Sequence, residues 1–255
     1  YPNLPNHKLG FLASEFPIHH EPTHNAMDDI LATAQLLIYA VTDRAWTKGR
    51  SLCEQVEETL KGGATMVQFR EKNLGQGNYD RMLAEALELR KLTERYQVPL
   101  IIDDDIELAL ACGADGLHVG RDDMDAGLAR KLLGPDRILG VTAKTVEQAK
   151  RACAQGADYL GSGAVFGTTT KADARPMTME TLRSICDCSD VPVVAIGGIN
   201  LGNIGLLEDS HVAGAAIVSG IFAAQDICLA TARLKEAMIK IRDKNSSYFQ
   251  KTVDI

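Results

Sequence analysis

Two aspartates in the chain are placed to share a metal ion. Asp104 and Asp123 stand 19 residues apart, and each follows a short apolar run. If the two runs form neighbouring strands, the carboxylates lie close together, and carboxylates with phosphate oxygens and water are usual ligands of Mg²⁺. Asp103 and Asp105 flank Asp104, and one of the three is expected to cap a helix at 106–112. The pattern predicts a magnesium site with Asp104 and Asp123 as ligands.

A second group of polar residues alternates at the end of another apolar run. Gln68, Arg70 and Lys72 are two residues apart in turn, so an extended chain projects their side chains from one face. Glu71 lies between the two cations, and the same alternation disfavours an internal ion pair with it. Two cations on one face need an anion, and a diphosphate beside Mg²⁺ is the matching ligand.

The stretch GSGAVFGTTTKADAR, residues 161–175, is typical of a loop that holds phosphate. It presents three hydroxyls and an ammonium group, those of Thr168, Thr169, Thr170 and Lys171. Two further segments, Gly197-Gly198 and Val218-Ser219-Gly220, follow later apolar runs, and glycine leaves backbone N–H groups accessible to a phosphate. Two anion sites, one of them with a metal, indicate two phosphorylated substrates.

Eight short apolar runs recur from residue 36 onward, and amphipathic stretches such as 51–61, 78–96 and 146–155 separate them. Each run is too short for a helix and rich in Val, Ile and Leu, as buried parallel strands are. The runs span residues 36–42, 65–69, 98–102, 116–119, 138–142, 159–166, 192–196 and 214–218. This alternation favours an α/β protein with a closed (β/α)₈ barrel, a TIM barrel. An open doubly wound sheet is the alternative, but the VTDRAW after the first run lacks the Gly-rich turn of such sheets.

The barrel is expected to form a single domain at residues 36–243. An irregular extension or linker, rich in Pro, His and Asn, precedes it at 1–35, and a frayed tail follows at 244–255. In such barrels the functional site lies at the C-terminal ends of the strands. The aspartates, the cations and the glycines described above all fall at those ends.

Composition narrows the classes of function. The formal net charge of −7 argues against nucleic acid as the main partner, because a phosphate backbone requires a basic surface. No apolar run approaches the ~18 residues that indicate a membrane helix. The six cysteines show neither CxxC pairs nor zinc spacing, so we expect thiols in a reducing compartment.

Seven segments together resemble the thiamin-phosphate synthase family. They are VQFREK (67–72), DDD (103–105), GADGLHVGRDDM (113–124), GVTAKT (140–145), GADYLGSGAVFGTTTK (156–171), VVAIGGI (193–199) and AIVSGIF (216–222). The match runs in order and spacing from about residue 36 to 240. The resemblance implies a (β/α)₈ barrel enzyme that joins 4-amino-2-methyl-5-(diphosphooxymethyl)pyrimidine, hereafter the pyrimidine diphosphate, to 4-methyl-5-(2-phosphooxyethyl)thiazole, hereafter the thiazole phosphate. The products are thiamin phosphate and pyrophosphate.

The resemblance also implies a role for each residue. Asp104 and Asp123 would hold Mg²⁺, and Arg70, Lys72 and Lys171 would stabilise the departing pyrophosphate. The expected contacts of the pyrimidine diphosphate are Gln68, Arg70, Glu71, Lys72, Asp103, Thr142 and Lys171. The expected contacts of the thiazole phosphate are Thr168, Thr169, Thr170, Gly198, Val218 and Ser219. The family's reaction is dissociative and needs no protein nucleophile, so catalysis would come from charge stabilisation and positioning.

The chain departs from the commonest family pattern at five positions, three of which are Thr142 for Ser, Lys144 for His and Gly167 for Pro. Asp103 stands where Asn is usual, and Arg121 stands where Gln is usual. Asp103 exchanges an amide donor for a negative charge. We therefore expect weaker binding of the pyrimidine diphosphate, unless Arg121 compensates.

Two other functions are alternatives for a chain with this pattern. The thiazole tautomerase branch of the superfamily uses a histidine for proton transfer, whereas His118 is expected within the fourth strand rather than at its end. The second alternative is a non-catalytic barrel domain that binds thiamin intermediates as part of a fused protein. Fusion to another thiamin-pathway domain and assembly into a homo-oligomer are both compatible with the sequence. The cytoplasm is the expected location, and a plastid fits if the source is a plant or alga.

Overall fold

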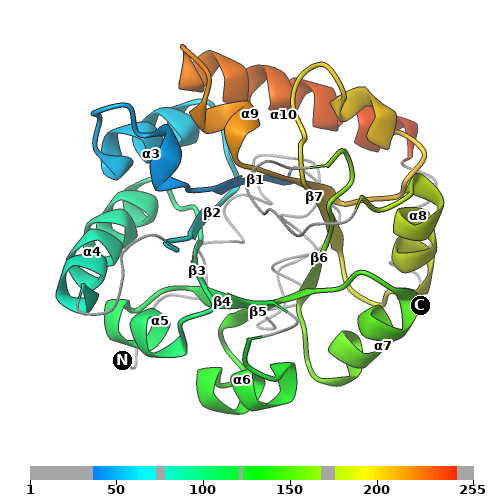
Figure 1. Cartoon of the computed structure of the whole chain (residues 1–255), viewed down its shortest axis with the longest axis horizontal. Helices are drawn as coiled ribbons and strands as arrows, with labels where there is room; N and C mark the ends of the chain where they lie inside the picture. The colour runs from blue at the N-terminus through cyan, green and yellow to red at the C-terminus, as the bar shows by residue number, and fades with distance from the viewer. Residues whose placement is uncertain (1–36, 73–77, 121–122, 168–175, 246–255) are drawn as a thin grey trace.

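Eight parallel strands, in chain order, close into a barrel that a ring of helices surrounds (Figure 1). The computed structural model describes residues 37–72, 78–120, 123–167 and 176–245. The closed barrel confirms the predicted (β/α)₈ fold and excludes the open sheet. The extension expected at 1–35 and residues 246–255 of the expected tail lie outside the described residues.

The strands form where the apolar runs predicted them. They are β1 (Leu37–Val41), β2 (Met66–Phe69), β3 (Leu100–Asp103), β4 (Gly116–Val119), β5 (Ile138–Thr142), β6 (Tyr159–Gly163), β7 (Val193–Ile196) and β8 (Gly214–Ile217). The largest difference is in β6, which was expected to reach residue 166. The last strand pairs with the first, with Ile38 opposite Ala215, and this pairing closes the barrel.

Helices follow most of the strands, and six of the described α-helices begin at a residue whose side chain caps the first turn. The helices are α3 (Leu52–Lys61), α4 (Tyr79–Arg95), α5 (Ile106–Cys112), α6 (Ala126–Leu133), α7 (Val146–Ala154), α8 (Met179–Cys188), α9 (Ser219–Phe222) and α10 (Ile227–Lys244), with short 3₁₀ helices η1 (Arg44–Trp46) and η2 (Ile204–Leu207). The Asp105 carboxylate accepts the Leu108 N–H at 2.9 Å at the start of α5. This cap confirms that one of the three consecutive aspartates serves the helix, which leaves the other two for the pocket.

A pair of Gly-Ala-Asp segments fastens the N-terminal ends of the strands. The carboxylate of Asp115, just before β4, accepts the backbone N–H of Leu100 in β3 at 2.9 Å. Arg90 of α4 pairs with the same carboxylate at 3.3 Å. Residues 156–158 repeat this arrangement before β6, where Asp158 accepts the Leu139 N–H at 2.7 Å and pairs with Arg130 of α6. We call these two arrangements the Arg–Asp clamps.

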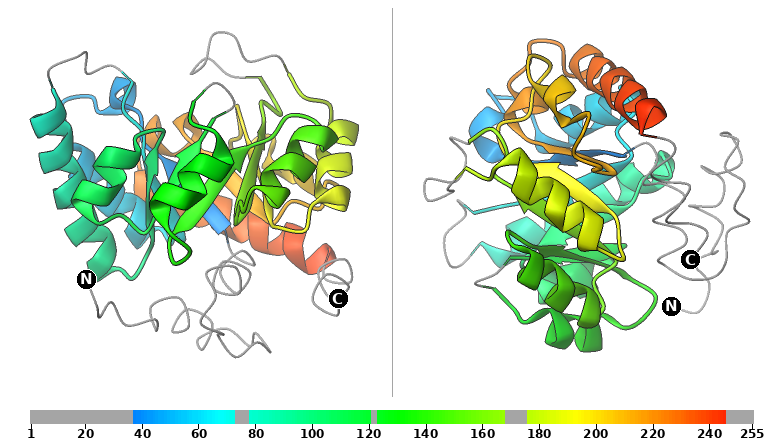
Figure 2. Two further views of the ribbon diagram at one scale, coloured as in Figure 1. Left: turned by 90° about the horizontal axis from the view of Figure 1, so that it is seen from below. Right: turned by 90° about the vertical axis from the view of Figure 1, so that its right-hand side faces the viewer.

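Apolar side chains fill two separate layers. The larger layer lies between the strands and the helices, which surround the barrel in the side views of Figure 2. The smaller layer lies inside the barrel and contains Tyr39, Val41, Met66, Ile101, Ile138, Tyr159, Val194 and Ala216. Gly140 of β5 leaves room for this layer, because a Cβ atom there would overlap the phenol of Tyr159 and the imidazole of His118. In the described residues, no helix is long and apolar enough to cross a membrane.

Gly140→Ala should therefore destabilise the barrel. We expect the free energy of unfolding to fall by about 3 kcal/mol, because the added methyl group overpacks the barrel interior. The matched control is Gly205→Ala, where a Cβ atom meets nothing within 4 Å. Urea unfolding of both variants measures the difference, and equal stabilities would contradict this account of the interior.

Candidate active site at the C-terminal end of the barrel

A pocket of about 170 Å³ lies at the C-terminal ends of the strands. Ten of the residues predicted from the sequence line it: Gln68, Arg70, Lys72, Asp103, Asp104, Asp123, Thr142, Gly198, Val218 and Ser219. They come from six different strands or the loops that follow them. The predicted residues Thr168, Thr169, Thr170 and Lys171 lie outside the described residues, as does Arg121. Glu71 is described but does not line this pocket.

The two cations that follow β2 face aspartates across the pocket. Arg70 Nε lies 3.6 Å from Asp103 Oδ2, and Lys72 Nζ lies 3.3 Å from the same oxygen. Lys72 also pairs directly with Asp104. Burial lowers the pKa of Lys72, but its contacts with Asp104 and Asp103 outweigh burial and leave the pKa above its ordinary value. Lys72 therefore stays charged in the pocket.

The carboxyl groups of Asp104 and Asp123 meet as the sequence predicted. They hydrogen-bond each other, and the backbone N–H of Gly120 donates to both, at 3.4 and 3.0 Å. Burial and the neighbouring Asp104 raise the pKa of Asp123. Burial also tends to raise the pKa of Asp104, but hydrogen bonds with Asp123 and Lys72 bring it below its ordinary value. The two carboxyl groups thus lie together at a position where a cation could bind both.

Asp104 adopts a backbone conformation that non-glycine residues seldom use. Its φ is 61°, in the left-handed region, and its backbone N–H donates to the carbonyl of His118 in β4 at 2.8 Å. This turn directs the carboxyl group of Asp104 toward Asp123. Left-handed residues outside glycine concentrate at functional sites.

Asp103 lies at the end of β3, deeper than the other two aspartates. Burial and the charge of Asp104 raise its pKa from 3.8 to about 6, although Lys72 and Arg70 act in the opposite direction. At neutral pH the Asp103 carboxylate is therefore ionised, and Arg70 and Lys72 balance its charge. A diphosphate would attract the same two cations. The sequence-based expectation that Asp103 opposes diphosphate binding stays a prediction.

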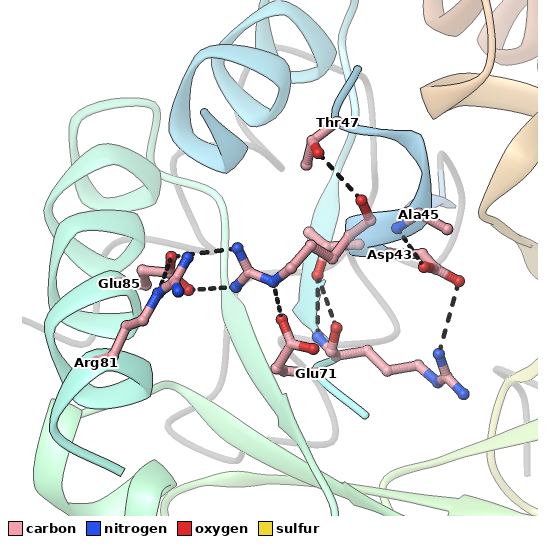
Figure 3. Close-up of polar contacts among 9 residues, drawn as sticks. Asp43, Ala45, Thr47, Glu71, Arg81 and Glu85 are labelled. Carbon is pink, nitrogen blue, oxygen red and sulfur yellow. Dashed lines mark hydrogen bonds and ion pairs between the residues drawn. The ribbon is translucent and has the colours of Figure 1, made fainter. Parts of the chain in front are cut away.

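Glu71 points away from the pocket, toward the loop after β1. Its side chain is only 2% exposed, and its carboxylate accepts a hydrogen bond from Arg44 Nε at 2.5 Å. Arg44 binds Glu85 of α4 with its other two nitrogens, and Arg81 also pairs with Glu85 (Figure 3). This arrangement separates Glu71 from the pyrimidine diphosphate contacts with which it was grouped. It anchors the backbone between Arg70 and Lys72.

The glycine-rich side of the pocket is formed by the loops after β7 and β8. Gly198 has a φ of 67°, and a Cβ atom there would overlap the backbone carbonyl of Gly167. Ser219 begins the short helix α9, next to Val218. Barrels commonly bind phosphate between these two loops and the start of a short extra helix. The three predicted residues Gly198, Val218 and Ser219 are therefore brought together here.

Three polar residues of the inner pocket have no role in the sequence-based prediction. Tyr39, His118 and Tyr159 line the inner part of the pocket and are 2%, 9% and 1% exposed. Each is a polar side chain inside a predicted strand, and that was the available signal. Sequence reasoning placed His118 correctly within the fourth strand, but the side chain still reaches the pocket.

Among the described residues, no group of three His, Cys, Asp or Glu side chains could hold a metal ion.

The fold and the pocket define a (β/α)₈ barrel with a charged pocket where barrel enzymes hold their active sites. The family model described as thiamine monophosphate synthase matches residues 38–221. Thiamine-phosphate synthase of Clostridium tetani is 43% identical over 190 residues, which cover 74% of this chain and 90% of that protein. The Clostridium acetobutylicum thiamine-phosphate synthase is 46% identical over 190 residues, covering 74% and 89%. The solved structure of thiamine phosphate pyrophosphorylase from Pyrococcus furiosus superposes with a TM-score of 0.74 at 37% identity, covering 82% of this chain and 98% of that one.

The chain belongs to the thiamine monophosphate synthase family. This confirms the resemblance drawn from the seven sequence segments.

Arg44→Met tests how much the buried ion pair with Glu71 contributes to stability. The variant keeps an apolar stem but removes the guanidinium from two carboxylates, so we expect the free energy of unfolding to fall by about 2–3 kcal/mol. Arg50→Met is the matched control, because the Arg50–Glu58 pair is 37% and 39% exposed and such pairs contribute below about 1 kcal/mol. Equal losses in urea unfolding would show that burial does not distinguish the two pairs.

Asp103→Asn should stabilise the protein at neutral pH and less so at acid pH. Because the folded-state pKa of Asp103 is raised from 3.8 to about 6, its ionisation costs stability progressively between these values and fully above them. We expect the variant to be more stable by about 2 kcal/mol near pH 7.5, with the difference vanishing toward about pH 4. Urea unfolding across this range, in buffer with a chelator, measures the effect. A pH-independent difference would contradict it.

Proposed function

We propose that this chain is the transferase that joins the pyrimidine diphosphate to the thiazole phosphate. The bond between the methylene carbon of the pyrimidine and its diphosphate oxygen breaks, and pyrophosphate leaves with the bonding electrons. The lone pair of the thiazole nitrogen then forms the new carbon–nitrogen bond, which gives thiamin phosphate. The observation that carries the proposal is the convergence of Arg70, Lys72, Asp104 and Asp123 on one pocket, in a chain of this family.

The charged side of the pocket suits the diphosphate. Arg70 and Lys72 project into it from one side of the chain, so both can bind phosphate oxygens as negative charge develops on the leaving group. Thr142, at the end of β5, lies on the same pocket and adds a hydroxyl. Lys171 completes this set in the proposal. Glu71 takes no part in binding and instead positions the two cations through Arg44.

The opposite side suits the second substrate. Gly198, Val218 and Ser219 provide backbone N–H groups and a hydroxyl for the phosphate of the thiazole. Thr168, Thr169 and Thr170 are assigned to the same phosphate. The apolar side chains of Ile196 and Val218 also line the pocket, where they pack against the inner apolar layer. They exclude water from the region in which the carbon–nitrogen bond forms.

Asp104 and Asp123 have the donor set that a magnesium ion requires. Their carboxyl groups already face each other, and a divalent cation would bind both. Mg²⁺ usually takes only one or two protein carboxylates and completes its shell with water and phosphate oxygens. When bound, Mg²⁺ would neutralise part of the charge of the diphosphate. Lys72 would then be released from Asp104 to bind phosphate.

The chain's residues can support this reaction without a protein base. The thiazole nitrogen supplies its own electron pair, and the leaving group departs as an anion that needs charge stabilisation rather than a proton. Positioning by the pocket makes the encounter of the two substrates effectively intramolecular.

The six cysteines are all free thiols, which supports a reducing compartment, and we propose the cytoplasm. Location in a plastid, fusion and oligomeric state stay predictions.

The test is turnover of the purified chain with Mg²⁺ and both substrates, measured as thiamin phosphate formed. We expect product, and Asp104→Ala should lower the rate by at least about 100-fold, because it removes a charge that serves the leaving group. The control is Asp136→Asn, an exposed aspartate that precedes β5 at the other end of the barrel.

Two results would contradict the proposed reaction, and a third would contradict only the metal site. Binding of the thiazole phosphate without turnover would indicate a non-catalytic barrel, and isomerisation of a thiazole without condensation would indicate a tautomerase. Full activity of Asp104→Ala would refute the metal site but keep the reaction.

A further inference from the structure

Five polar side chains form an unbroken row of hydrogen bonds across the inner part of the pocket. Gln68 Nε2 donates to the Tyr39 hydroxyl at 2.7 Å, and the hydroxyls of Tyr39 and Tyr159 lie 2.8 Å apart. The Tyr159 hydroxyl is 3.0 Å from His118 Nδ1, and His118 Nε2 is 2.9 Å from Thr142 Oγ1. Four of the five are buried, and all five line the pocket. We call this row the hydroxyl–imidazole chain.

With Gln68 Nε2 as the donor and a neutral His118, one direction of the hydrogens satisfies every contact in the chain. Burial raises the pKa of both tyrosines far above the ordinary value, so each keeps its single hydroxyl hydrogen. Tyr39 receives a hydrogen from Gln68 and must therefore give its own to Tyr159. Tyr159 then has only His118 Nδ1 left as acceptor. A neutral imidazole that accepts at Nδ1 carries its hydrogen on Nε2, and this hydrogen goes to Thr142.

This direction decides what each end of the chain offers to a ligand. Gln68 has used its amide nitrogen on Tyr39, so its oxygen Oε1 remains as an acceptor. Thr142 has received a hydrogen from His118, so its own hydroxyl hydrogen remains as a donor. Within the described residues, neither group has another hydrogen bond. The pocket therefore presents an acceptor at one end and a donor at the other.

We propose that Tyr39, Tyr159 and His118 are positioning residues that impose this direction, so that Gln68 selects the amino group of the pyrimidine and Thr142 donates to its diphosphate. The identity of the ligand rests on the proposed function. An exocyclic amino group is a donor and fits Gln68 Oε1, and a diphosphate oxygen is an acceptor and fits the Thr142 hydroxyl. If the chain ran the other way, both ends would face the wrong partner.

The proposal predicts discrimination against one analogue. A pyrimidine diphosphate with an oxo group in place of the amino group would set an acceptor against Gln68 Oε1. A buried polar group left facing a like group is a strong basis for rejection. The selectivity would come from residues that need not touch the amino group themselves.

The first experiment reads the direction without any substrate. Nitrogen-15 NMR of the full chain with labelled histidine distinguishes the two neutral tautomers, and His118→Asn assigns the signal among the six histidines. We expect a hydrogen on Nε2 of His118. A hydrogen on Nδ1 would mean that the chain runs in reverse and would overturn the proposal.

The second experiment breaks the chain while keeping its shape. Tyr39→Phe frees the amide of Gln68 to rotate, so we expect the KM for the pyrimidine diphosphate to rise about 10-fold, with the KM for the thiazole phosphate unchanged. Preference for the amino substrate over the oxo analogue should fall by a similar factor. Tyr96→Phe is the matched control, because its hydroxyl binds Glu57 at 3.2 Å outside the pocket.

The outcomes separate this proposal from the proposed function. If Tyr39→Phe keeps both its KM and its preference for the amino substrate, the positioning role fails while the transferase stands. If both KM values rise together, Tyr39 has only a structural role, and the proposal fails. If the unaltered chain makes no thiamin phosphate, the proposed function and the ligand assignments fail together, whereas the tautomer of His118 still decides the direction of the chain.

Discussion

The alternation of side chains at the end of β2 is the constraint on which the charge of the pocket depends. Because successive side chains of an extended segment point to opposite faces, Arg70 and Lys72 enter the pocket and Glu71 leaves it. The carboxylate is then buried outside the barrel, where Arg44 neutralises it. A shift of one residue would place the anion in the pocket and the cations in the helical layer. The local charge of the pocket thus follows from the period of a single strand.

The pocket balances its charges internally before any ligand is bound. Arg70 and Lys72 face Asp103 and Asp104, so binding of an anion must exchange one set of partners for another. The pairing with the aspartates keeps the two cations oriented in the free protein. This lowers the reorganisation that is needed when negative charge develops on a bound substrate. Asp103 is a buried carboxylate with a raised pKa. If an anion takes its cations, its own negative charge loses the groups that neutralise it.

Most of the fold and part of the pocket could be predicted from the sequence, for reasons that lie in local chemistry. The strands are apolar runs bounded by helix caps, and period two placed Gln68, Arg70 and Lys72 together. Glu71 was grouped with them because its partner, Arg44, is 27 residues away and approaches only in the folded barrel. Tyr39 and Tyr159 are 120 residues apart, and only closure of the sheet brings their hydroxyls into contact. Pairings at such separations leave no periodic trace in a sequence.

The Arg–Asp clamps have a consequence for how this protein can change over evolutionary time. They join strands to helices at the N-terminal end of the barrel, the end opposite the pocket, through backbone groups and partly buried charges. The fastening of the scaffold and the chemistry of the pocket therefore depend on different residues. A substitution such as an aspartate at position 103 can accumulate in the pocket without loosening the clamps. The scaffold is evolvable because residues at one end of the barrel maintain its stability and residues at the other end determine its chemistry.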